Sequence, residues 1–288
     1  IIRKSLIIFF IFLAFPSQSL STSSNIDDKG IIVLMYHRFE ENKYPSTNIK
    51  IVDFIKHINL IKENQFKFVN PNVFEENLLN HKNEKKILLT IDDGFKSFYD
   101  QAWPILKKEK IPFILFVNTR EVGTSGYMSW KQIKEISKEN FVHIGNHSYS
   151  HEYLIDMSNQ EIMDDINLAI SDFKNNLGYN SSFFSYPFGE YSNNFKNIIK
   201  NLGFKYAFGQ HSGVADETKD FYELPRFPIN EAYGKIKRFE TILKTIPLKF
   251  KSIIPEEKYI QEVNNPPEII IEFFETSKNI KLLNCYSN

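Results

Sequence analysis

The sequence has one cysteine, few glycines and prolines, and no excess of either charge. The single Cys285 cannot form an internal disulfide, which excludes a disulfide-stabilised scaffold. With 11 Gly and 12 Pro in 288 residues, collagen-like and Pro/Gly-rich disordered chains are excluded as well. Lys+Arg and Asp+Glu both number 35, so the formal net charge is zero and gives no support for nucleic-acid binding.

Apolar and aromatic residues are plentiful. Hydrophobic residues make up 42% of the chain, and its 27 Phe argue against disorder. A length of 288 residues suits one large domain or two small ones, and an α/β barrel of this size is commonly a single domain.

The first residues have the order of a secretory signal. Arg3 and Lys4 precede an apolar run, Leu6–Phe15, which is followed by Pro16 and small polar residues up to Ser19. The run is shorter than the ~20 apolar residues that span a bilayer. We therefore predict a cleaved signal peptide over residues 1–21, and the alternative is an uncleaved N-terminal anchor.

Short β-rich runs alternate with helical patterns through the middle of the chain. From Ile51 onward, isoleucine and phenylalanine recur at the spacing of a helix. A second helix is predicted to begin at a capping box, Ser158–Glu161, and to end at Gly178. Seven such βα units predict a parallel sheet wrapped by helices. The predicted strands are Ile31–Met35, Lys67–Val69, Ile87–Ile91, Phe113–Val117, Phe141–Gly145, Ser182–Tyr186 and Phe204–Phe208.

In such folds the chemistry lies just past the carboxyl ends of the strands. Asp92, Asp93 and Gly94 follow an apolar strand directly, and the glycine lets the chain turn so that both carboxylates can converge there. An ordinary Asp-Asp-Gly turn is the alternative.

Two histidines follow the strand that ends near Gly145. His147 and His151 are four residues apart, which lets both imidazoles bind one divalent ion. His143 has the same spacing from His147, but it lies inside the strand run and is interpreted as a packed or surface histidine. With Asp93, the pair would form a mixed nitrogen and oxygen set with open positions, as in catalytic metal sites.

A third segment, Ser185–Tyr191, places aromatic residues around Pro187 and Gly189 after a strand. Such a rigid loop could offer exposed rings for stacking on a sugar and a free backbone N–H for an oxyanion. Taken alone, it could equally be an ordinary Pro-Gly turn.

In this order, Asp-Asp-Gly, the spaced histidines and Tyr-Pro-Phe-Gly resemble the motifs of the polysaccharide deacetylases, the NodB-homology group or carbohydrate esterase family 4. The resemblance covers roughly residues 30–230. It extends to Leu34-Met35-Tyr36-His37-Arg38-Phe39 and Leu224-Pro225-Arg226-Phe227. It implies a distorted (β/α)₇ barrel that removes N-acetyl, and sometimes O-acetyl, groups from carbohydrates with one divalent metal ion.

The resemblance also implies roles for individual residues. Asp92 would be the general base, and the metal ligands would be Asp93, His147 and His151. The Phe188 N–H would stabilise the oxyanion, and the expected substrate-binding residues are Tyr186, Pro187, Phe188, Gly189 and His37.

Two family features are missing. Many members carry an arginine where this chain has Ser185, and Arg226 is our candidate replacement, pairing with Asp92 and keeping it ionised. Many members also have a Leu-x-His motif that supplies the general acid. Without it, His211 and His37 are the available imidazoles, and we favour His211.

The C-terminal residues are less informative. We predict the deacetylase domain over residues 28–235 and a β-containing extension over 236–288, with an irregular connector from Pro247 to Pro267 and strands at Glu268–Phe274 and Ile280–Tyr286. Because two strands alone rarely form a stable unit, they either add to the barrel surface or belong to a truncated extension.

The sequence therefore predicts an exported, metal-dependent N-deacetylase of N-acetylhexosamine polymers or oligomers, located in the periplasm or cell envelope. The metal is zinc, with cobalt, manganese or nickel as alternatives. The partner is an acetylated glycan, with no nucleic acid and no membrane span after signal cleavage. The alternatives are an O-acetyl esterase of the xylan type and a non-catalytic glycan-binding protein.

Overall fold

The computed structural model describes residues 30–79, 84–260 and 262–274. The predicted signal peptide, the predicted strand Ile280–Tyr286 and Cys285 lie outside these ranges. No helix among the described residues is both long and apolar enough to cross a membrane.

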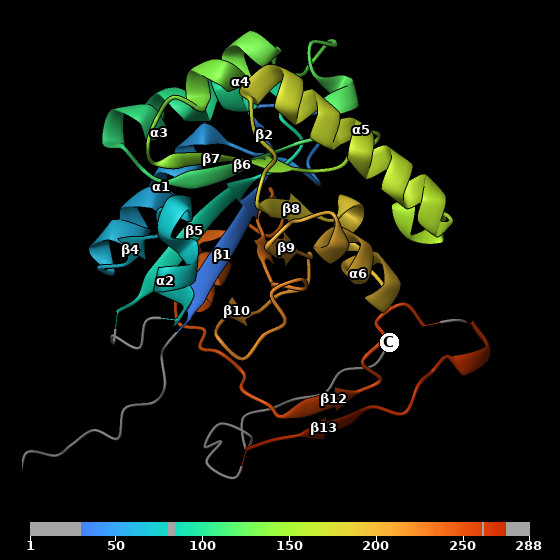
Figure 1. Cartoon of the computed structure of the whole chain (residues 1–288). Coiled ribbons are helices and arrows are strands. Elements are labelled where there is room, and N and C mark those ends of the chain that lie inside the picture. Colours follow the sequence, from blue (N-terminus) through green and yellow to red (C-terminus); the bar gives the residue numbers. More distant parts are fainter. Residues whose placement is uncertain (1–29, 80–83, 261, 275–288) are drawn as a thin grey trace, which may run out of the picture.

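One curled sheet organises the structure and forms a half-barrel (Figure 1). Its strands run in the order β10-β1-β5-β6-β7-β8-β9, while β11 pairs with β1 and β4 with β5. All pairs are parallel except β1 with β10. The strands are β1 (Ile31–Tyr36), β4 (Lys67–Phe68), β5 (Lys86–Ile91), β6 (Phe113–Val117), β7 (Val142–Asn146), β8 (Phe183–Ser185), β9 (Tyr206–Phe208), β10 (Val214–Ala215) and β11 (Phe227–Pro228).

The seven predicted strands are all present, with ends that differ by up to two residues. Their near-continuous apolar sequences suit strands that are buried on both faces, as parallel strands usually are. Every residue of β1 and β5 is buried, and Tyr36 at the end of β1 pairs with Ile91 at the end of β5. The predicted (β/α)₇-type fold is therefore confirmed.

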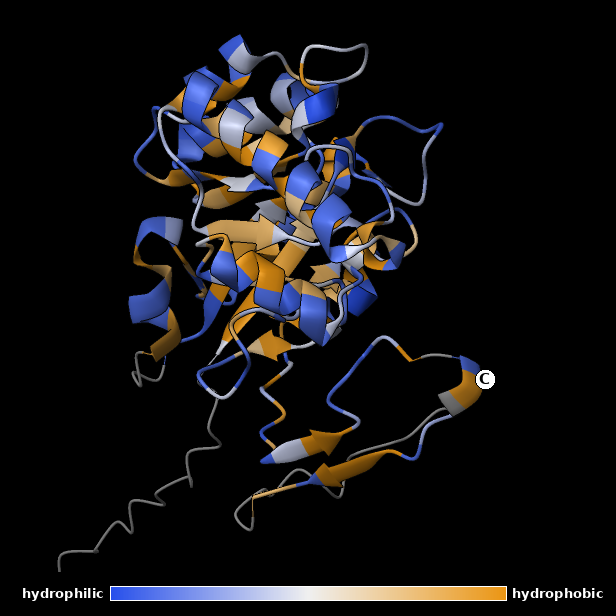
Figure 2. Cartoon of the chain, turned by 45° about the vertical axis from the view of Figure 1, so that its right-hand side comes forward, coloured by the Kyte–Doolittle hydropathy of each residue, from blue (hydrophilic) through white to orange (hydrophobic). Residues whose placement is uncertain are grey.

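Helices cover the outer face of the sheet, with their apolar sides inward and their polar sides outward (Figure 2). The longest described helix, α5, begins at the predicted capping box of Ser158. It ends at the predicted Gly178, which has a left-handed φ of 81°. The helices are α1 (Ile51–Glu63), α2 (Phe74–Leu79), α3 (Trp103–Glu109), α4 (Trp130–Ile136), α5 (Asn159–Leu177), α6 (Asn193–Asn201) and α7 (Ile236–Ile242).

The last helix packs on the barrel. The Phe239 ring of α7 stacks on His57 of α1, with centroids 3.9 Å apart and planes 6° from parallel. Both side chains are fully buried. The domain boundary that we predict at residue 235 therefore lies just before α7, whose buried Phe239 packs against α1.

Two smaller sheets complete the structure. β2 (Arg38–Phe39) pairs with β3 (Asn48–Ile49), and β12 (Ser252–Ile254) pairs antiparallel with β13 (Ile270–Glu272). The strand predicted at Glu268–Phe274 is confirmed at its centre. The prediction of an irregular connector from Pro247 to Pro267 is wrong where β12 lies, because three residues are too few to show a strand period.

Candidate active site

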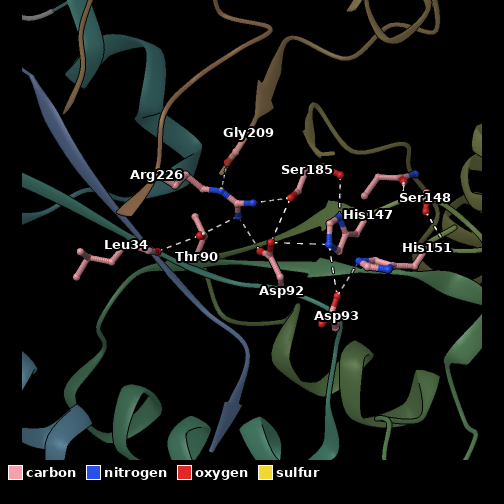
Figure 3. Close-up of polar contacts among 11 residues, drawn as sticks. Leu34, Thr90, Asp92, Asp93, His147, Ser148, His151, Ser185, Gly209 and Arg226 are labelled. Carbon is pink, nitrogen blue, oxygen red and sulfur yellow. Dashed lines mark hydrogen bonds and ion pairs between the residues drawn. The ribbon is translucent and has the colours of Figure 1, made fainter. Parts of the chain in front are cut away.

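Polar side chains gather where β5, β7 and β8 end (Figure 3). Asp92 and Asp93 follow β5, His147 follows β7, and Ser185 ends β8. Because β5, β6, β7 and β8 are successive parallel strands of the sheet, their carboxyl ends meet at one edge. The candidate residues therefore lie together at the strand ends, where the sequence led us to look for them.

Asp93, His147 and His151 face one another. Oδ1 of Asp93 lies 3.4 Å from Nε2 of His147 and 3.3 Å from Nε2 of His151. One ligand atom from each residue lies within 4.8 Å of the others. Asp93 and His147 are buried, and the His151 side chain is 22% exposed, so the cluster opens to solvent on one side.

The backbone around this cluster is unusual. Asp93, Ser148 and His151 have φ values of 74°, 68° and 55°, in the left-handed region that non-glycine residues rarely adopt. Such conformations persist only where the surroundings enforce them, and they gather at functional sites.

The histidine loop is fixed by hydrogen bonds that sequence reasoning missed. The carboxylate of Asp165, on α5, accepts the backbone N–H groups of Tyr149 and Ser150 at 2.9 and 3.1 Å. The Ser148 hydroxyl accepts the N–H of His151 at 2.9 Å. Nothing near Asp165 in the sequence signals this role, because its partners come from another element.

The donor set fits a cation. The Ser185 carbonyl can only accept, so Nδ1 of His147 donates to it at 2.7 Å, and in the neutral imidazole Nε2 then has a lone pair. That Nε2 and Oδ1 of Asp93 are buried, and neither has a hydrogen-bond partner among the described residues. Two buried acceptors that face each other need a positive charge between them, and carboxylate and imidazole ligands suit a divalent ion.

Asp92 lies beside the cluster in a second network (Figure 3). Nη1 of Arg226 donates to Oδ1 of Asp92 at 2.8 Å, and both side chains are fully buried. The predicted pairing of Arg226 with Asp92 is thus confirmed. The Ser185 hydroxyl accepts from Nη2 of Arg226 at 2.8 Å and donates to Oδ2 of Asp92 at 3.2 Å.

Two more groups hold the guanidinium. Nε of Arg226 donates to the Gly209 carbonyl at 2.9 Å, and Nη1 also donates to the Thr90 hydroxyl at 3.2 Å. Thr90 was not predicted, although its position supplies a signal. It is a hydroxyl inside an apolar strand two residues before Asp92, so both side chains are on one face.

Burial alone would raise the pKa of the Asp92 carboxyl. The positive charge of Arg226, together with His147 and His37, instead holds that pKa below its ordinary value. Asp92 therefore stays ionised near neutral pH, as a proton acceptor must.

Arg226→Ala should slow the reaction and destabilise the fold, because it leaves the Asp92 charge buried without its partner. Breaking a buried pair typically costs about 3–5 kcal/mol. The pKa of Asp92 should rise, so the acid limb of the activity profile should move to higher pH. Thermal unfolding, metal content and a pH–rate profile test this, with Arg238→Ala on α7 as the control. Unchanged activity with Arg226→Ala would remove its assignment.

The aromatic loop differs from the prediction. Tyr186 is completely buried and its hydroxyl donates to the Tyr222 carbonyl at 2.9 Å, while Tyr191 is also buried. The prediction of exposed rings is wrong for these two residues, because their rings pack with the core beside α6. Tyr186 can therefore offer a substrate only backbone atoms.

Phe188 is the exposed ring of this loop. Its side chain is 48% exposed and its centroid lies 4.8 Å from that of His151. Pro187 begins the turn, whose hydrogen bonds come from the N–H groups of Gly189 and Glu190 and so do not use the N–H of Phe188. Gly189 has φ 75°, and a Cβ there would come within 2.6 Å of the Gln210 backbone, so only glycine fits.

The two candidate acids have different surroundings. Tyr36 pairs with Ile91, and its carbonyl accepts the N–H of Asp92 at 2.8 Å, so His37 lies next to Asp92 along the sheet edge. The pKa of His37 is lowered overall, because burial outweighs the charges of Asp93 and Asp92, which act to raise it. The charges that act on His211 are instead those of Lys258, Lys219 and Arg226.

His143 is a packed histidine, as predicted. Its Nε2 lies 3.2 Å from the Ser181 hydroxyl, and its ring packs edge-on against Phe183 at 4.9 Å. It therefore does not belong to the cluster of Asp93, His147 and His151.

Comparison with known proteins agrees with this geometry. Residues 80–207 match the family model of polysaccharide deacetylase. The poly-β-1,6-N-acetyl-D-glucosamine N-deacetylase of Staphylococcus aureus is 26% identical over 162 residues, which are 51% of this chain and 56% of that enzyme. This chain thus spans little more than half the length of that relative.

Solved structures share the fold. IcaB from Ammonifex degensii superposes with a TM-score of 0.68 at 26% identity, covering 75% of this chain and 98% of that one. The Streptococcus pyogenes deacetylase PplD gives the same TM-score at 22% identity, over 75% of this chain and 99% of that one. The chain therefore contains a polysaccharide deacetylase domain, in which residues 80–207 match the family model.

Proposed function

We propose that this protein is an exported, metal-dependent N-deacetylase of N-acetylhexosamine polymers. The observation that carries the proposal is the cluster of Asp93, His147 and His151 next to the buried pair of Asp92 and Arg226. The name of the staphylococcal relative supports an N-acetylglucosamine polymer as the substrate. Export to the periplasm or cell envelope is proposed from the signal-like order of residues 1–21.

Asp93, His147 and His151 would hold the ion, for which zinc is our first choice and cobalt, manganese and nickel are alternatives. Such an ion polarises a carbonyl and makes a nearby water more acidic. Asp92 then accepts the proton of the attacking water, because Arg226 and Ser185 hold it ionised and in place.

Phe188 would serve the substrate in two ways. Its backbone N–H, which the turn does not use, can donate to the oxyanion of the tetrahedral intermediate. Its exposed ring beside His151 can stack on the sugar that carries the acetyl group.

The leaving amine needs a proton, because an amide anion is a poor leaving group. The sequence led us to favour His211 for this role, and the placement of His37 next to Asp92 supports His37 instead. His37 is half-buried and faces the charges of both carboxylates. We therefore propose His37 as the general acid.

The two histidines can be separated by pH–rate profiles. A general acid must be protonated, so its titration produces the alkaline limb of a bell-shaped profile. His37→Asn should remove that limb and lower kcat by about 10²–10⁴-fold. His211→Asn should keep the bell shape, and the opposite pattern would return the role to His211.

Acetate release from a glycan panel tests the function itself. The mature protein should release acetate from poly-β-1,6-N-acetylglucosamine or chitooligosaccharides, lose this activity with a chelator and regain it when a divalent metal is added. Release from acetylated xylan alone would indicate an O-acetyl esterase. Metal and glycan binding without any acetate release would indicate a non-catalytic protein.

A further inference from the structure

A pocket adjoins the candidate active site, and residues of the segment 248–253 line its other side. It has a volume of about 890 Å³ and begins at the loop that follows β8, where Phe188 and Tyr191 line it. The Phe188 ring also contacts His151, so the pocket and the candidate metal site share a wall. A ligand bound at the Phe188 end of the pocket would therefore lie beside the candidate metal site.

The far wall comes from a segment that sequence reasoning treated as a connector. Leu248, Phe250 and Ile253 line the pocket from that side. The Lys219 ammonium donates to the Leu248 carbonyl at 2.6 Å and lies 4.4 Å from the centre of the Phe250 ring. These contacts hold the segment against the barrel next to the pocket.

Two further contacts fix the same segment near the active site. The Glu257 carboxylate accepts the backbone N–H of Asn193 at the start of α6, at 3.0 Å. The Tyr259 hydroxyl donates to Asp156 at 2.5 Å, in the loop that follows His151. The segment thus contacts the start of α6 and the loop that follows His151, as well as the pocket.

We propose that this pocket is a subsite for the sugar residues that flank the reacting N-acetylhexosamine along the polymer. Its lining combines aromatic rings and aliphatic chains with hydrogen-bonding groups, which matches the apolar faces and hydroxyl rim of a pyranose. Its charged residues include Glu190 and Glu223 as well as Lys219 and Lys258, so it has no excess of either sign. A neutral glycan suits this balance better than a polyanion.

The subsite also gives His211 a role. His211 lines the pocket as an exposed residue. Desolvation by the surrounding residues, followed by the charges of Lys258 and Lys219, lowers its pKa to about 4. A neutral imidazole has one donor and one acceptor, which is suitable for hydrogen bonds with sugar hydroxyls. His211 would thus bind substrate rather than donate the catalytic proton.

The inference rests on the proposed deacetylase function, so its test compares substrate lengths. Kinetics are measured on a disaccharide and a hexasaccharide of N-acetylglucosamine with the full chain. Phe250→Ala removes an aromatic ring from the pocket lining. Leu248→Trp fills part of the pocket and keeps the backbone carbonyl that accepts the hydrogen bond from Lys219. Each should raise KM for the hexasaccharide about fivefold to tenfold and leave kcat unchanged, with a smaller rise of KM for the disaccharide, which has only one flanking sugar.

Phe274→Ala is the matched control, because this exposed ring belongs to the same C-terminal segment but does not line the pocket. It should leave both KM values unchanged. Equal KM values of the wild type for both lengths, or variants that match the wild type on the hexasaccharide, would overturn the subsite and leave the deacetylase function intact. If the wild type released no acetate from either glycan, the proposed function itself would fail.

Discussion

Asp93→Asn is expected to lower kcat/KM by about 10³-fold or more and to reduce the bound metal. The variant removes the carboxylate charge whose Oδ1 lies 3.4 and 3.3 Å from Nε2 of the two imidazoles. An ion that polarises the scissile carbonyl contributes several kcal/mol, and each 1.36 kcal/mol is a tenfold change in rate. Asparagine is the right replacement, because it tolerates the φ of 74° at this position better than alanine.

Two histidine variants provide a matched comparison. His143 and His151 are each four residues from His147, but only His151 lies near Asp93. His151→Asn should lose metal and activity, and asparagine again suits the local φ of 55°. His143→Asn should keep both. Loss of the metal in His143→Asn and its retention in His151→Asn would contradict the ligand set.

Asp92→Asn should lower kcat by about 10²–10⁴-fold while the metal content remains that of the wild type. The amide cannot accept a proton from water, although it keeps the size of the carboxylate. The variant also leaves the Arg226 charge buried without a counter-charge, so its stability should fall as well. Rates must therefore be measured well below the unfolding temperature of the variant.

The double variant Asp92→Asn/Arg226→Met separates the two effects. Removing both charges should restore part of the lost stability, because no unpaired buried charge remains. It should not restore kcat, because the proton acceptor is still absent. A double variant with wild-type kcat would show that Asp92 is a structural residue and that the base lies elsewhere.

Much of the fold could be predicted from local patterns. Each buried parallel strand is a short apolar run, and the polar residues after three of these runs marked the candidate site. The capping box at Ser158 and the glycine at 178 are local signals too, so they predicted both ends of α5. Strand β12 was not predicted, because it is short and is stabilised by pairing with β13, which lies further along the sequence.

Other features depend on contacts between distant segments. Arg226 lies 134 residues from Asp92, and family resemblance rather than spacing pointed to it. Choosing between His37 and His211 requires the register of β1 against β5, which no local pattern gives. The sequence likewise does not show that Tyr186 turns inward while Phe188 turns outward, because that depends on packing beside α6.

X-ray absorption of the zinc-loaded protein tests the candidate metal centre most directly. We expect one zinc ion per chain, bound by two imidazole nitrogens and carboxylate oxygen, and an imidazole contribution that decreases in His151→Asn. A protein that binds no zinc after loading, or a zinc spectrum that Asp93→Asn and His151→Asn leave unchanged, would show that these residues do not hold the ion.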